Sequence, residues 1–109
     1  MDTRALAAYL PTVVRSSDRA GAITLREDPV LGDVLVIADG ESGYATHLYR
    51  FEGMLMEDYA RIGAALSPER AQRIAATARF EVKLTNKLIV VETDAGRVLI
   101  HPRSGGETA

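Results

Sequence analysis

The stretch from residue 79 to residue 103 constrains the fold more than any other part of the chain. It holds three apolar segments, separated by turn-forming residues at 85–87 and 94–96. The segments that we expect to be strands are residues 80–84, 88–91 and 98–100. The first alternates apolar and polar residues, whereas the middle one is apolar throughout, so we expect it to be buried on both faces. The pattern predicts an antiparallel meander whose central strand the rest of the chain must cover.

Three further strands are expected in the first half of the chain. They are marked by alternating or continuous apolar residues, and clusters of Gly, Pro, Asp and Ser separate them. Their expected ranges are residues 22–27, 34–37 and 44–51. In the third of these, apolar side chains lie on both sides, which we interpret as an edge strand or an interface.

Helices are expected to cover this sheet. Apolar residues recur at helical spacing near the N-terminus and again between residues 55 and 66. The residues of these two stripes are Leu6, Tyr9, Leu10, Val13 and Val14, then Leu55, Tyr59, Ile62 and Leu66. Ser67, Pro68 and Glu69 have the features of a helix start, with Ser as N-cap and Pro at the first helical position. A second helix is therefore predicted to continue through residues 71–78.

The predicted fold class is α+β. It consists of an antiparallel sheet of five to six strands with helices packed on it, in the order helix, three strands, one or two helices, three strands. With 109 residues the chain is long enough for one domain, which we place at residues 1–103. Residues 104–109 are small and polar, and we expect them to form a flexible tail.

Composition excludes several classes of function. The formal net charge is −2 with acidic and basic residues intermixed, so no basic face for nucleic acid is expected. The absence of cysteine removes disulfides and thiolate chemistry. No apolar run approaches the roughly 20 residues that span a bilayer. We therefore expect a soluble cytoplasmic protein that binds neither nucleic acid nor membrane.

Motifs for catalysis or metal binding are not evident in the sequence. His47 and His101 lie far apart and neither has the spacing of a metal site. The glycine-containing segment 39–43 lacks the lysine and following helix of a phosphate-binding loop, so it is interpreted as a hairpin turn. No serine has the setting of a nucleophile elbow. We expect no catalytic residues, no cofactor and no metal, and hence a protein that is not an enzyme.

One segment is unusually rich in aromatic and methionine side chains, which are common in protein contact surfaces. The residues that we predict to bind a partner are Tyr44, Tyr49, Phe51, Met54, Met56 and Tyr59. Most side chains of this kind lie in protein cores. If the chain has a binding site, this segment is where the sequence places it.

The order of these elements resembles the roadblock / dynein light chain superfamily. The matching parts are the N-terminal helix, a strand pair at 22–27 and 34–38, a long central helical segment, and a three-strand ending whose closest match is LIVVETDAGRVLI at residues 88–100. The resemblance implies a non-enzymatic homodimer that regulates or scaffolds a small GTPase. The same order is also similar to secretion-chaperone-like folds, which are small acidic homodimers that hold a stretch of another protein.

Several functional hypotheses follow. The first is a homodimeric protein-interaction module, with a protein partner that could be a small GTPase or, in the chaperone-like alternative, an unfolded segment. The second is a small-molecule-binding domain with a pocket between sheet and helices that uses Tyr49, His47 or Arg50. A third and weaker one is an inhibitor that acts by charge complementarity.

Overall fold

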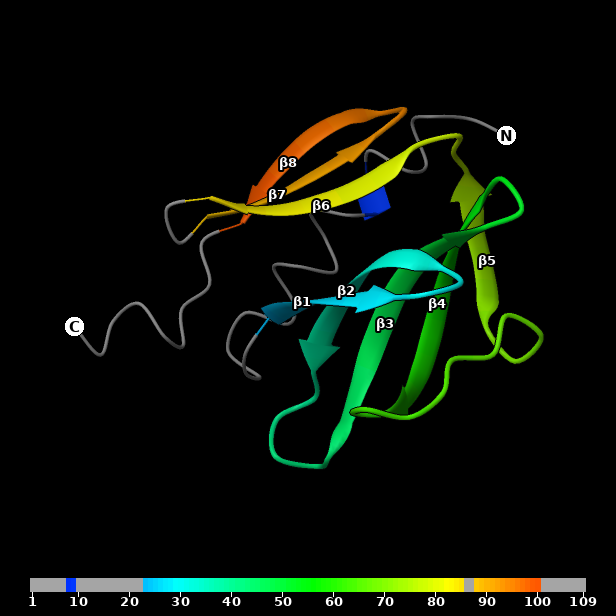
Figure 1. The fold of residues 1–109 in the computed structure, drawn as a ribbon, viewed down its shortest axis with the longest axis vertical. Coiled ribbons are helices and arrows are strands. Elements are labelled where there is room, and N and C mark those ends of the chain that lie inside the picture. The colour runs from blue at the N-terminus through cyan, green and yellow to red at the C-terminus, as the bar shows by residue number, and fades with distance from the viewer. Residues whose placement is uncertain (1–7, 10–22, 86–87, 101–109) are drawn as a thin grey trace.

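The computed structural model describes residues 8–9, 23–85 and 88–100. Within them the chain forms eight strands in two antiparallel sheets (Figure 1). The five-stranded sheet contains β1 (Ile23–Asp28), β2 (Gly32–Ala38), β3 (Tyr44–Phe51), β4 (Met54–Arg61) and β5 (Gln72–Ala76). The three-stranded sheet contains β6 (Phe80–Thr85), β7 (Leu88–Thr93) and β8 (Gly96–Ile100). Each sheet follows chain order, so within a sheet consecutive strands pair, whereas β5 and β6 lie in different sheets.

The predicted α+β class is therefore wrong. In the described residues only Ala8 and Tyr9 have helical backbone, and the remainder of the expected N-terminal helix lies outside them. The expected tail at residues 104–109 also lies outside the described residues. No helix in the described part of the chain is long and apolar enough to cross a membrane.

The central segment that was predicted to be helical is strand β4. Its eight residues pair in register with β3, from Tyr44 opposite Arg61 to Phe51 opposite Met54. The helical spacing of apolar residues was misleading, because Leu55 is buried whereas Tyr59 and Ile62 are about half exposed. Both faces of β4 carry buried side chains, so its sequence lacks the strict alternation that marks a strand with one wet face.

The predicted helix at residues 67–78 is also wrong. Its capping residues form one turn, in which the carbonyl of Ser67 accepts hydrogen bonds from the backbone N–H groups of Arg70 and Ala71. The chain then straightens into β5, which pairs with β4. Ser67, Pro68 and Glu69 thus form a single turn, and the residues after them pair with β4 as a strand and do not continue as a helix.

The C-terminal meander is confirmed, but not the burial of its middle strand on both faces. β7 pairs with β6 on one side and with β8 on the other. Ile89 and Val91 of β7 are buried against the first sheet, whereas Leu88 and Val90 on the outer face are only partly covered. One face of β7 is therefore the core face, and in the described chain no helix covers the other.

The predicted strands at 22–27, 34–37 and 44–51 are confirmed as β1, β2 and β3, except that residue 22 lies outside the described residues. The interpretation of residues 44–51 as an edge strand is wrong, because β3 lies in the middle of the five-stranded sheet, whereas the alternative of an interface stays a prediction. Apolar side chains occur on both of its sides because both faces of this sheet are buried. One face packs against the three-stranded sheet, and the other carries a second apolar cluster.

The core between the two sheets is apolar and contains side chains from every strand, including Leu48 of β3. Its buried members are Ile23, Leu35, Ile37, Leu48, Leu55, Ala75, Phe80, Val82, Ile89, Val91 and Ile100. Figure 1 shows the three-stranded sheet lying over one end of the five-stranded one. Burial of this apolar surface is the main force that holds the two sheets together.

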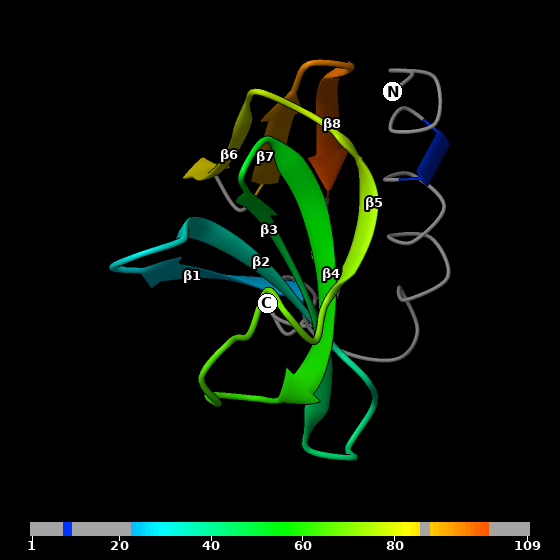
Figure 2. The same cartoon turned by 90° about the vertical axis from the view of Figure 1, so that its right-hand side faces the viewer.

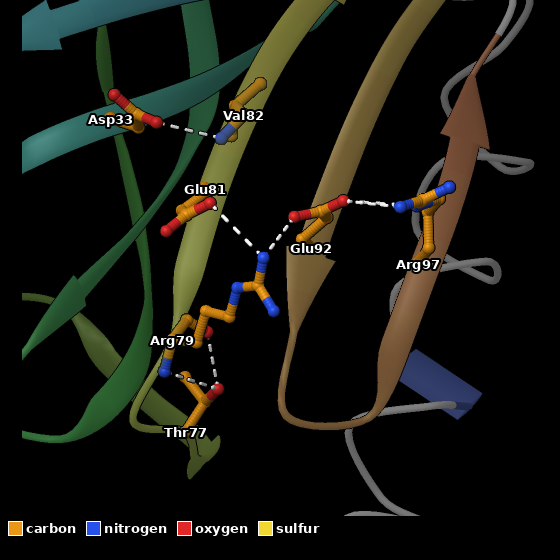
Figure 3. A network of polar contacts seen from close by, with 7 residues as sticks. All are labelled: Asp33, Thr77, Arg79, Glu81, Val82, Glu92 and Arg97. Carbon is orange, nitrogen blue, oxygen red and sulfur yellow. Dashed lines mark hydrogen bonds and ion pairs between the residues drawn. The ribbon is translucent and has the colours of Figure 1, made fainter.

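Two polar contacts fix the second sheet on the first (Figure 3). The backbone N–H of Val82 in β6 donates to a carboxylate oxygen of Asp33 at the start of β2, at 2.8 Å. Thr77, which is buried in the link between β5 and β6, accepts hydrogen bonds from the N–H groups of Arg79 and Asp94. Beyond this link, Arg79 and Arg97 form ion pairs with Glu92 on the outer face. The link and the Asp33 contact therefore set where β6 crosses the first sheet.

Candidate functional site

The turn between β3 and β4 places three of the predicted partner-binding residues side by side. It contains only Glu52 and Gly53, whose φ angles are 52° and 76°. Positive φ at both positions is typical of a type I′ turn, which joins strands without disturbing their twist. Phe51 and Met54 face each other across the turn, and Met56 follows on the same face of β4. The hairpin end thus carries an apolar surface.

A segment between β4 and β5, residues 62–71, crosses this face of the sheet, and we call it the cover segment. Figure 2 shows it as the loop that leaves the end of β4 and returns to the start of β5. It contains no regular secondary structure beyond the Ser67 turn and a turn at its start, where the N–H of Ile62 donates to the carbonyl of Gly43 and that of Ala64 to the carbonyl of Arg61. The position of the residues that follow must therefore be set by side chains that reach them from the sheet.

Asp58 of β4 is the main anchor of the cover segment. Its carboxylate is fully buried and accepts a hydrogen bond from the Ser67 backbone N–H at 2.8 Å. The guanidinium of Arg70 donates to the other carboxylate oxygen through Nε at 2.9 Å and Nη2 at 2.8 Å. The Tyr49 hydroxyl completes the set by donating at 3.0 Å. A buried carboxylate that is paired and hydrogen-bonded in this way is costly to disturb.

A second anchor comes from β1. Arg26 donates from Nη2 to the carbonyl of Ala64 at 3.1 Å. This bond ties the beginning of the cover segment to β1, which is the edge strand at the other end of the sheet from β5. The cover segment is thus held near both of its ends, by Arg26 and by Asp58. Its middle residues are left to form the wall of a groove.

The anchoring residues have shifted titration properties. Burial, together with the hydrogen bond to Asp58, raises the pKa of Tyr49, so its hydroxyl keeps its proton. Burial lowers the pKa of His47, which is fully buried beside Asp58 and is neutral at pH 7. His47 Nδ1 lies 3.1 Å from the carbonyl oxygen of Asp58 and therefore carries the hydrogen. These residues are placed to hold structure, since none opens onto the groove.

The groove consists of two adjoining hollows on either side of Phe51, Pro68 and Glu69. The first, of about 530 Å³, separates the β1–β2 turn from the cover segment, and its lining is Asp28, Val30, Leu31, Phe51, Ala65, Leu66, Ser67, Pro68 and Glu69. The second, of about 310 Å³, is lined by Phe51, Glu52, Met54, Met56, Pro68, Glu69 and Arg73. Both hollows are open to solvent. The exposed lining of the first is mainly apolar, whereas that of the second is about half polar, with Glu52, Glu69 and Arg73 beside its apolar side chains. Val30 at the rim is 86% exposed.

The rim of the groove carries more acidic than basic groups. Asp28, Glu52 and Glu69 line it together with one cation, Arg73. Hydrogen bonds from the N–H groups of Leu31 and Val30 lower the pKa of Asp28, so it is ionised at pH 7. The groove therefore combines an apolar floor with a negative rim.

The predicted partner-binding residues do not form one site. Phe51, Met54 and Met56 lie in the groove, whereas Tyr49 is buried beneath the cover segment. Tyr44 and Tyr59 lie toward the other end of the hairpin, roughly 24 Å from Phe51 and roughly 17 Å from Met54 respectively, at about 3.4 Å per strand residue. There their rings stack with centroids 5.6 Å apart, and the Arg61 guanidinium lies 5.3 Å from the centre of the Tyr44 ring.

The residues named for a small-molecule pocket do not line either hollow. His47 and Tyr49 are fully buried, and Arg50 donates from Nε to the carbonyl of Thr77 at 3.1 Å. Among the described residues, no three His, Asp or Glu side chains are grouped so that they could hold a metal ion. Sequence reasoning missed Leu66 and Glu69 as groove residues and Asp58 as their anchor. The one available signal was an aspartate at a core position of an apolar segment.

Comparison with known proteins identifies a family. Residues 1–95 match the family described as Domain of unknown function (DUF4860). Neither a curated protein nor a solved structure matches the chain. Because the match covers most of the sequence, the chain belongs to the DUF4860 family.

Proposed function

We propose that this protein is a non-enzymatic interaction module that binds another protein in the groove beside the β3–β4 turn. The observation that carries the proposal is the pair of adjoining open hollows around Phe51, whose floor includes Met54 and Leu66. Methionine and aromatic side chains adapt to varied apolar partners and are enriched in interfaces. An open groove of this kind leaves most of a small ligand in water, whereas a protein segment can fill both hollows.

The proposal keeps the protein-binding function that the sequence favoured and does not depend on the expected helices. The groove wall is a loop that buried side chains hold in place, so the surface is formed before a partner arrives. Such preorganisation reduces the entropy that binding must offset. This supports a binding role rather than a purely structural one for the cover segment.

A site-specific photocrosslinker tests the proposal. The crosslinking amino acid benzoylphenylalanine replaces Val30 at the groove rim or, as a control, Leu99, which is 54% exposed on the second sheet. We expect a discrete protein adduct in the native host from the Val30 position but not from the Leu99 position. Adducts that are equal at both positions, or absent at both, contradict the proposed function.

A further inference from the structure

We infer that the segment bound in the groove carries apolar side chains next to lysine or arginine. This inference rests on the proposed function and specifies the chemistry of the partner. It follows from three features of the groove: its apolar floor, the sign of the charge on its rim, and the backbone conformation of one rim residue.

The floor selects apolar side chains. Phe51 and Pro68 line both hollows, so the apolar surface runs continuously from one into the other. Leu66 closes the first hollow from the cover segment, and Met54 closes the second from the hairpin. Two neighbouring side chains of an incoming segment can therefore be buried together, each contributing roughly 25 cal/mol for every Å² of apolar surface removed from water.

The rim selects positive charge. Glu69 borders both hollows, Asp28 borders the first and Glu52 the second, whereas Arg73 is the one cation among the lining residues. Nη2 of Arg26 lies 3.9 Å from a carboxylate oxygen of Asp28, so the positive charge of Arg26 partly offsets the negative charge of Asp28. Glu52 and Glu69 form no ion pair within the described residues. A segment with lysine or arginine beside its apolar residues satisfies these carboxylates, whereas an acidic segment is repelled by them.

Glu52 occupies a position that suits few residue types. Its φ of 52° lies in the left-handed region, where the backbone of residues other than Gly, Asn and Asp is strained. Asparagine would form the same turn with less strain. Strain of this kind tends to persist where a side chain serves a function. If the Glu52 carboxylate binds a cationic side chain of the partner, this role explains why a glutamate occupies a strained position.

Three capped peptides of eight residues test the inference with the full-length protein. The first has a central Leu-Phe pair followed by two lysines, the second replaces the lysines by glutamates, and the third replaces Leu-Phe by two serines. We expect the first to bind at least about ten-fold more tightly than either of the others, and to bind more weakly in 0.5 M NaCl. Amide shifts in NMR spectra should be confined to residues near Phe51 and Leu66.

Matched variants locate the charge effect. Glu69→Gln and Glu52→Gln should each weaken binding of the lysine peptide by roughly two- to five-fold. Glu41→Gln, which removes an exposed carboxylate from the turn between β2 and β3, should leave the affinity unchanged. Equal loss in all three variants would mean a non-specific charge effect and would overturn the inference.

The two proposals fail in different ways. If the Val30 crosslink captures a segment of another protein that is acidic or that lacks lysine and arginine, the inferred partner chemistry is wrong while the binding function stands. If the glutamate peptide binds as well as the lysine peptide, the same conclusion follows. Capture of a second copy of this chain contradicts the proposed binding of another protein. If no segment is captured at Val30, the proposed function itself fails.

Discussion

The hydroxyl of Tyr49 in β3 donates a hydrogen bond of 3.0 Å to the carboxylate of Asp58 in β4, and both side chains are fully buried. The same carboxylate holds Ser67 and Arg70, so one contact between two strands helps to position the groove wall. The residues that shape the site are thus partly residues that never reach its surface.

Tyr49→Phe should destabilise the protein, because it removes one hydrogen bond from a buried charged group. Such bonds contribute about 1.5–3 kcal/mol, and we expect a loss of this size in urea unfolding. Tyr44→Phe is the matched control, since its hydroxyl has no hydrogen bond within the described residues and its ring remains able to stack on Tyr59. Its free energy of unfolding should change by less than about 0.5 kcal/mol. Equal losses in the two variants would contradict the anchoring role of Asp58.

Six of the eight strands in the described residues were predictable from sequence, whereas β4, β5 and the cover segment between them were not. Residues 44–51 and the three segments after residue 79 were predicted to be strands because turn-forming residues separate them, and the structure confirms these strands. β4 was missed because both of its faces are buried, which removes the alternation and leaves a spacing that also fits a helix. Pairing with β3 decided the outcome, and such long-range pairing is not encoded in a local pattern.

The residues that line the candidate groove differ in how far a local sequence pattern indicates them. Phe51, Met54 and Met56 were predicted because a short hairpin turn brings together residues that are close in sequence. Leu66 and Glu69 join them only because Asp58 anchors the cover segment across the sheet. Asp58 of β4 and the cover segment come together only in the folded sheet. Because this part of the chain was predicted to be helical, the sequence pattern could not show that they are in contact.

Acid should destabilise the fold through His47. Burial lowers the pKa of this imidazole in the folded state, so between that value and about 6.5 the unfolded chain binds a proton that the folded chain does not. The free energy of unfolding should therefore be level above pH 7 and fall as the pH drops below about 6.5. Nearby Arg26 opposes protonation, while the carboxylate and carbonyl of Asp58 favour it. Urea unfolding at pH 5, 6, 7 and 8 measures the slope.

His47→Gln is the control for this pH dependence. The variant lacks the titrating group, so its unfolding free energy should vary less between pH 5 and pH 7 than that of the unchanged protein. His101 is present in both proteins, and its titration cancels in the comparison. The lowered pKa of Asp28 contributes only below about pH 4, outside this window. Identical slopes in the two proteins would rule out His47 as the cause.

Glu52→Asn should stabilise the protein and weaken the proposed binding. Asparagine tolerates the left-handed φ at this position better than glutamate, which we expect to raise the free energy of unfolding by roughly 0.5–1 kcal/mol. Glu41→Asn, at an exposed position where φ is not positive, should change it by less than about 0.5 kcal/mol. Thermal unfolding measures both variants. A lower melting temperature for Glu52→Asn would show that the glutamate side chain stabilises the turn.

Asp33→Ala should loosen the second sheet on the first. The Asp33 carboxylate accepts the Val82 N–H on the side of β6 that does not pair with β7, so alanine leaves a buried residue's N–H without its partner. We expect a loss of about 1–2 kcal/mol and faster hydrogen exchange at the Val82 amide. Asp33→Asn retains a side-chain oxygen that can accept the same bond, so its exchange rate should stay close to that of the unchanged protein. If the asparagine variant exchanges as fast as the alanine variant, the charge of Asp33, rather than its hydrogen bond, stabilises the contact between the sheets.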